Sequence, residues 1–204
     1  MKNEVKQNSS FSDKLEAWLK SKKPKTLTSL DEVFADKSFA ITILLLMFIP
    51  ALPLPTGGIT HIFEIITVLL ALEMLVGRRT IWLPSRWKNM KLGAVIERRA
   101  IPMILHRIRW FEKHSSQKFN RIFQLPLFTQ LNALVIIVFT AAAFMAPPFS
   151  GLDTLPALGV VLLCLSVILE DAKILILGYV SGVAGTAIVV AAGAATINII
   201  HRLF

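Results

Sequence analysis

Two side chains that can pass a proton between them lie three residues apart in an otherwise apolar stretch. They are His61 and Glu64, and Thr67 follows after a further three residues. Residues three or four apart are neighbours on a helix, so this spacing predicts a polar stripe along one helical face. Because imidazole changes its charge near neutral pH, the stripe could relay a proton or contact a polar head group. The alternative is that both side chains are solvated next to the loop that precedes them.

The sequence contains no other pattern typical of an enzyme active site. Metal-ligand spacing, a nucleophile elbow, a phosphate-binding loop and paired catalytic carboxylates are all absent from it. Cys164 is the single cysteine, which excludes an intramolecular disulfide and a cysteine-rich zinc or iron–sulfur site. We therefore expect no catalytic residue, no metal, no cofactor and a function that is not enzymatic.

The composition indicates which elements must hold these side chains. Apolar residues make up 54% of the 204 residues and charged residues only 17%, whereas about 25% charged residues is usual in soluble domains. Long uncharged stretches alternate with charged ones, which predicts an all-α integral membrane protein. The uncharged stretches cover residues 38–60, 127–152, 154–169 and 174–200.

The lengths of the apolar stretches divide the chain further. About 20 helical residues are needed to cross a membrane, and three stretches fall short of that number: 38–49, 131–145 and 155–169. We therefore expect two broken helical hairpins, either re-entrant or fully crossing with tilt, followed by one long C-terminal transmembrane helix. The expected units are an N-terminal cytoplasmic segment with short amphipathic helices at 1–37, a first hairpin at 38–77, a basic interfacial segment at 78–126, a second hairpin at 127–171 and the last helix at 172–204.

Prolines and glycines fall at corresponding places in the two hairpins. A shift of 93 positions aligns residues 39–77 with 132–170 without a gap, which predicts a duplicated, parallel pseudo-repeat. A turn inside a membrane must be buried in protein or line a wet cavity, and interrupted segments at matching positions mark binding sites in transporters. A plain turn between helices is the alternative. The candidate substrate- or ion-binding residues are Pro53, Pro55, Gly57, Gly58, His61, Glu64, Pro147, Pro148, Gly151 and Asp153.

The positive charge, +9 in total, is concentrated in the middle of the chain. Residues 78–121 hold twelve Lys/Arg against two Glu. Short basic segments remain on the cytoplasmic side, so this one and the N-terminus are expected there. Apolar positions at helical spacing predict interfacial helices on anionic phospholipid rather than a nucleic-acid site. The candidate head-group contacts are Arg78, Arg79, Trp82, Trp87, Arg98, Arg99, Arg107 and Arg109.

The last apolar stretch carries glycines three and four residues apart. Gly178, Gly182 and Gly185 lie on one helical face, and such small residues let two helices approach closely. The close contact could be made inside one chain or across a homodimer, and the sequence leaves both arrangements open.

Several short motifs occur together in an order that is typical of a known family. They are Pro53-Leu54-Pro55 with Gly57-Gly58, Gly77-Arg78-Arg79, Trp82-Leu83-Pro84, Pro147, Pro156 and Leu169-Glu170-Asp171. Over roughly residues 28–200 the chain resembles the ExoD family of bacterial exopolysaccharide-synthesis membrane proteins. The resemblance implies a multi-pass protein of the bacterial inner membrane that is needed for exopolysaccharide production. It implies polysaccharide-synthesis proteins as partners and no established catalytic residues.

These expectations favour a protein that handles or translocates an envelope lipid, a saccharide precursor or a coupled ion at the Pro/Gly loops. A membrane scaffold that regulates the exopolysaccharide machinery is the second hypothesis, and an enzyme acting on a lipid-linked sugar is the third. Substitutions at His61, Glu64 and Asp153 distinguish the first two. A transporter would lose activity while it remains folded, whereas a scaffold would be more sensitive to changes in residues 78–121.

Overall fold

The computed structural model describes residues 11–21, 26, 37–53, 59–78, 81–82, 103, 105–106, 109, 123, 125–147 and 150–203. Within these residues the chain forms six helices and no β-strand. The helices are α1 (Phe11–Lys20), α3 (Ser38–Met47), α4 (Ile59–Leu75), α8 (Pro126–Met145), α9 (Thr154–Leu169) and α10 (Ala172–Leu203). The all-helical expectation is therefore confirmed, whereas most of the basic segment at 78–126 lies outside the described residues.

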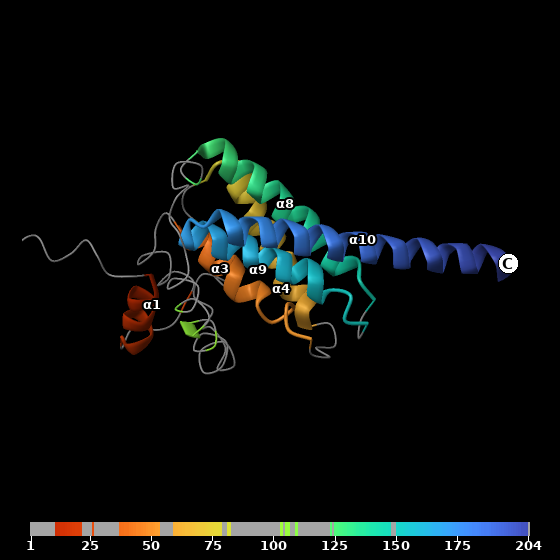
Figure 1. Ribbon diagram of the computed structural model, residues 1–204, viewed down its shortest axis with the longest axis horizontal. Coiled ribbons are helices and arrows are strands. Elements are labelled where there is room, and N and C mark those ends of the chain that lie inside the picture. Colours follow the sequence, from red (N-terminus) through yellow and green to blue (C-terminus); the bar gives the residue numbers. More distant parts are fainter. Residues whose placement is uncertain are drawn as a thin grey trace, which may run out of the picture.

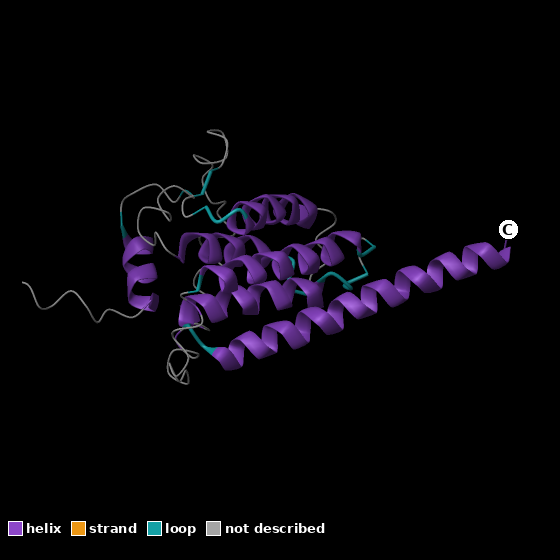
Figure 2. Ribbon diagram, turned by 90° about the horizontal axis from the view of Figure 1, so that it is seen from above, coloured by secondary structure: helices purple, strands orange, loops and turns teal. Residues whose placement is uncertain are grey.

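Five of the helices pack into one bundle (Figure 1). α9 contacts α3, α8 and α10, while α4 packs against α3 and α8. All ten residues of α3 are buried, so this short helix belongs to the centre of the bundle. α10 runs along the bundle and then projects well beyond it toward the C-terminus (Figure 2).

α8 is longer than the sequence predicted. Leu125 has an extended backbone, and Pro126 follows at the start of the helix, where its missing N–H removes no helical hydrogen bond. With 20 residues, α8 is long and apolar enough to cross a membrane, as is Ala172–Asn198 of α10. The expectation that the first arm of the second hairpin is too short to cross is therefore wrong, whereas α3 and α9 are short apolar helices.

α9 and α10 approach so closely that backbone meets backbone. A methyl group added at Gly159 would lie 2.5 Å from the Cα atom of Gly182, and one added at Gly185 would lie 2.5 Å from the nitrogen of Pro156. Gly178 faces the backbone of Leu163 in the same way. Such contacts require residues without a side chain. The predicted glycine face thus packs inside the chain, and the homodimer stays a prediction.

Polar contacts hold the turn between α9 and α10. Glu170 ends α9 with a left-handed backbone, at a φ of 54°. Its carboxylate accepts a 2.8 Å hydrogen bond from Nζ of Lys37, which also donates to the carbonyl oxygen of Ile168. Oδ1 of Asp171 accepts a 2.7 Å hydrogen bond from the backbone N–H of Lys173 and so caps the start of α10. These contacts tie the start of α3 to the end of α9.

Candidate functional site

A hydrogen-bonded pair of side chains lies in the first turns of α4. Nδ1 of His61 is 2.8 Å from Oε2 of Glu64. The Glu64 side chain is fully buried, whereas 31% of the His61 side chain is exposed. The imidazole therefore lies between the buried carboxylate and the outside of the bundle. The distance from its Nδ1 to Oε2 of Glu64 is short enough for direct proton exchange.

The ends of three helices meet around this pair. The ring of Phe144, near the end of α8, packs on the imidazole of His61, with ring centroids 4.8 Å apart and planes tilted by 58°. Asp153 immediately precedes α9 and lies close enough for its charge to act on that of Glu64. Residues from both predicted hairpins therefore come together at this place.

The other predicted loop residues are placed only in part. Three of them are exposed in the loop ends, namely Pro53, Pro147 and Gly151. Gly151 has a φ of 69°, a backbone conformation that glycine adopts without strain. Four lie outside the described residues: Pro55, Gly57, Gly58 and Pro148. Of the ten candidates, the structure thus pairs His61 with Glu64 and places Asp153 within range of the charge of Glu64.

Three buried oxygen atoms on α4 and α8 have no hydrogen-bond partner among the described residues. They are Oε1 of Glu64 and the hydroxyl oxygens of Thr67 and Thr140. Glu64 and Thr67 are three residues apart on α4 and therefore lie on the same face. Buried polar atoms are normally hydrogen-bonded, so each of these unpaired oxygens is an exception that needs a specific explanation.

The register in which α8 packs on α4 places Thr140 at about the same height along the bundle as Glu64. His61 contacts Phe144 near one end of the two helices, and a methyl group on Gly77 would lie 3.8 Å from Nε2 of Gln130 near the other end. The helices are therefore antiparallel, and one turn back from Phe144 corresponds to one turn forward from His61. Sequence reasoning placed Thr67 on the polar stripe but missed Thr140, because its position depends on this register.

A second set of unpaired polar groups lies toward the opposite end of the bundle. The hydroxyls of Ser38 and Thr42 on α3, and both amide atoms of Asn132 on α8, are buried without a partner among the described residues. Sequence reasoning missed this set as well. Its one signal was the four-residue spacing of Ser38 and Thr42, which places both on one face of α3.

Three of the predicted head-group residues are described. The guanidinium of Arg78 lies 5.7 Å from the centroid of the exposed Trp82 ring. The backbone N–H of Trp82 donates a 2.6 Å hydrogen bond to Glu73. An exposed cation beside an indole is typical of a membrane interface. The third residue is Arg109, and the others lie outside the described residues: Arg79, Trp87, Arg98, Arg99 and Arg107.

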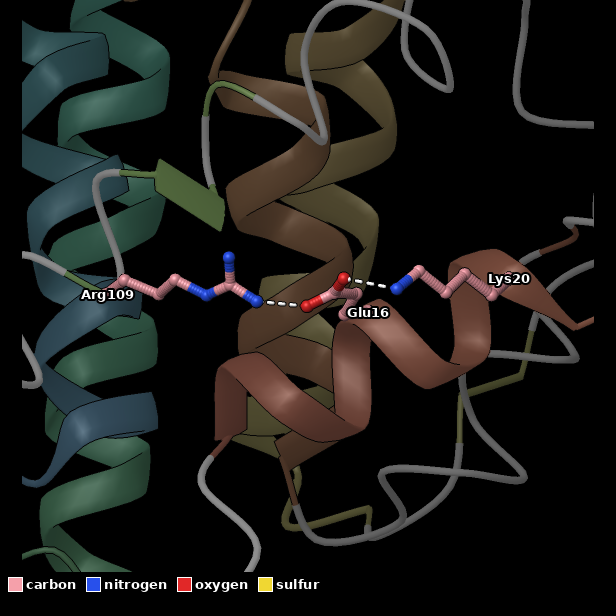
Figure 3. Close-up of polar contacts among 3 residues, drawn as sticks. All are labelled: Glu16, Lys20 and Arg109. Atoms are coloured by element: carbon pink, nitrogen blue, oxygen red, sulfur yellow. Dashed lines mark hydrogen bonds and ion pairs between the residues drawn. The ribbon is translucent and has the colours of Figure 1, made fainter.

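Arg109 contacts the N-terminal helix. Glu16 of α1 accepts hydrogen bonds from Arg109 and from Lys20, the latter at 2.6 Å (Figure 3). The hydrogen bond from Lys20, and then the charge of Arg109, hold the pKa of Glu16 below its usual value. Leu15 and Trp18 of α1 are buried. α1 is therefore held by buried apolar side chains. The carboxylate of Glu16 offsets the charge of Arg109, which belongs to the basic segment.

The sequence is similar to a known protein family over most of its length. Residues 11–191 match the family described as "Exopolysaccharide synthesis, ExoD". An uncharacterised protein of Synechocystis sp. (strain ATCC 27184 / PCC 6803 / Kazusa) is 27% identical over 125 residues, which are 61% of this chain and 58% of that protein. The match therefore spans little more than half the length of this relative. No solved structure is significantly similar to the chain.

Proposed function

Because this chain belongs to the ExoD family of exopolysaccharide synthesis, we propose that it is a multi-pass protein of the bacterial inner membrane that translocates an envelope lipid or a lipid-linked saccharide precursor. The proposed site is the place where the loop ends of α3–α4 and α8–α9 meet at His61. The observation that carries the proposal is the position of these loop ends along α10. They lie near the middle of a membrane-length helix, and they bring polar side chains there.

The surface of the bundle supports a membrane location. α4 exposes Ile62, Ile65, Leu69 and Leu72 along one stripe, while its polar stripe faces inward. α8 and α10 likewise expose large apolar side chains: Leu127, Leu131, Leu134, Val138, Ile176, Leu177, Val180 and Val183. Apolar residues outside and polar residues inside are the arrangement that lipid favours, since intramembrane polar groups face the bundle interior.

Contacts along α10 give the position of the loop ends along this helix. Gly185 of α10 faces Pro156, in the first turn of α9. Gly185 lies about 13 residues, or about 20 Å, from the start of α10. A further stretch of about the same length remains before the apolar part of α10 ends at Asn198. If α10 crosses the membrane, the loop ends therefore lie near its middle, and the two helical pairs are re-entrant.

The contacts between helices support the proposed duplication. The 93-residue shift exchanges α3 with α8 and α4 with α9. α3 packs on α4 and α9, and correspondingly α8 packs on α9 and α4. The contacts among these four helices are thus unchanged by the exchange, which is what a pseudo-twofold axis between two repeats requires. Transport sites commonly lie on such an axis near the bilayer midplane.

The depth of the loop ends can be measured directly. We expect a fluorophore on Met145→Cys to be quenched most strongly by lipids that carry a nitroxide on the acyl chain. A fluorophore on Asn198→Cys should be quenched most strongly by lipids that carry it on the head group. Both side chains are exposed, and replacing the buried Cys164 by alanine leaves one reactive thiol in each variant. Head-group quenching at Met145→Cys, with weak quenching at Asn198→Cys by either lipid, would mean that the hairpins cross fully, as the length of α8 permits.

Exopolysaccharide production tests the function itself. In a strain that lacks the wild-type chain, we expect His61→Gln or Asp153→Asn to lower production about tenfold, as a loss of about 1.4 kcal/mol of binding free energy would. Arg78→Gln is the comparison, because this exposed residue lies away from the pair at the other end of α4. Equal amounts of each variant in the membrane exclude a folding defect. A large loss with Arg78→Gln and none with the other two would instead indicate the scaffold function.

A further inference from the structure

We propose that Glu64 is a proton-binding site that alternates between a charged state paired with His61 and a neutral state bonded to the hydroxyls of Thr67 and Thr140. This inference rests on the proposed function, in which the bound proton would be the coupled ion. The geometry that points to it is a buried carboxyl group with one oxygen on an imidazole and the other unpaired.

The two oxygens of Glu64 have different surroundings. Oε2 is 2.8 Å from Nδ1 of His61, whereas Oε1 is buried and has no partner among the described residues. A charged carboxylate is acceptor-only, so Oε1 can pair only with a group that donates. A buried charge is costly unless it is paired and hydrogen-bonded. The protonated form has an O–H to donate, and an acceptor oxygen is what it would need.

Two hydroxyl oxygens are available as that acceptor. Thr67 lies on the face of α4 that carries Glu64, and the contacts of His61 and Gly77 put Thr140 of α8 at about the same level. Neither hydroxyl has a partner among the described residues. Each hydroxyl can accept one hydrogen bond and donate another. Each hydroxyl could therefore donate to a charged Glu64 or accept the O–H of a neutral one, and the neutral form avoids a buried charge.

The proton transfer is balanced within the pair. The imidazolium of His61 gives its Nδ1 proton to Oε2 of Glu64, so the ring becomes neutral and the carboxylate becomes a neutral acid. Rotation about the terminal torsion of Glu64 then presents the new O–H to Thr67 or Thr140. The imidazole, now an acceptor at Nδ1, turns away from the carbonyl oxygen that comes to face it. The reverse sequence returns the proton to the imidazole, which can release it because the His61 side chain is 31% exposed.

The described helices that pack against α4 bring no further charge to this pair. α3 and α8, the two helices packed against α4, contain no acidic, basic or histidine residue. The loop residues 54–58 before α4 contain none either. Asp153 is the carboxylate whose charge acts on Glu64. Among the described residues, His61 and Asp153 are therefore the groups to which the protonation of Glu64 should mainly respond.

Infrared difference spectroscopy of the full-length protein in detergent tests the proposal. Between acidic and alkaline samples we expect a protonated-carboxyl band that Glu64→Gln removes and Glu73→Gln leaves in place. Thr140→Val should shift the frequency of this band, because it removes one hydrogen-bond partner. His61→Gln keeps a hydrogen-bond donor but removes the cation, so the midpoint of the band's titration should move to higher pH by about one unit or more.

Circular dichroism confirms that each variant is folded. A band that survives in folded Glu64→Gln, or a Glu64 band that does not respond to pH, Thr140→Val or His61→Gln, would overturn the proposal. Its failure is distinguishable from failure of the proposed function. If the wild-type protein shows no Glu64 band but the label on Met145→Cys is quenched by acyl-chain lipids, translocation would proceed without proton coupling. If Glu64 titrates but the label on Met145→Cys is quenched by head-group lipids, the proton site would exist without a re-entrant hairpin.

Discussion

Gly182→Leu is expected to destabilise the helical bundle strongly. A Cβ atom at this position would overlap the ring of Phe139 on α8, and the Cα atom of Gly182 already lies against Gly159 on α9. The leucine side chain cannot turn away from both neighbours. Overpacking a core with a few methylene groups costs about 1 to 3 kcal/mol, and backbone on one side leaves little room to relax. We therefore expect a loss of at least about 3 kcal/mol, a large part of the usual stability of a domain.

Size-exclusion chromatography and thermal unfolding in detergent would measure this loss. Gly193→Leu is the matched control, because it makes the same change on the same helix at a position with no atom within 4 Å. That variant should keep the wild-type elution volume and Tm. A folded Gly182→Leu variant with the wild-type Tm would contradict the packing argument. If that variant were monomeric where the wild type is dimeric, the homodimer alternative would hold instead.

The sequence was informative where a feature depends on neighbours along the chain. Pro50 follows α3 closely and Pro126 begins α8, and both positions follow from the missing N–H of proline. The three-residue spacing of His61 and Glu64 was enough to place them on one face of α4. The glycine spacing predicted a close helix contact, although not which helix would supply the other side.

Features that depend on helix register could not be predicted. Thr140 lies level with Glu64 only because α8 is antiparallel to α4 in one particular register. Lys37 and Glu170 are 133 residues apart in sequence, and nothing in their local surroundings links them. Glu170 also has a left-handed backbone, which glycine or asparagine would signal but glutamate does not. These contacts follow from packing of whole helices rather than from local sequence.

Asn132→Leu is expected to stabilise the protein. The residue is 1% exposed, and neither its Nδ2 nor its Oδ1 has a partner among the described residues. An unsatisfied buried polar group costs about 1 to 3 kcal/mol, and leucine has a similar volume without that cost. We expect a gain of about 2 kcal/mol and, for a chain of this size, a rise in Tm of about 4 to 8 °C. Thermal unfolding in detergent measures it.

Asn198→Leu provides the control, because Asn198 is exposed near the end of α10 and should change the Tm little. A lower Tm for Asn132→Leu would show that the amide of Asn132 has a partner outside the described residues. The contrast with Thr140 is informative, because both are buried polar residues of α8 without a partner there. Removal of the Asn132 amide should raise stability and leave exopolysaccharide production unchanged. Thr140→Val should alter the carboxyl band of Glu64, because its hydroxyl is proposed to bind the protonated state.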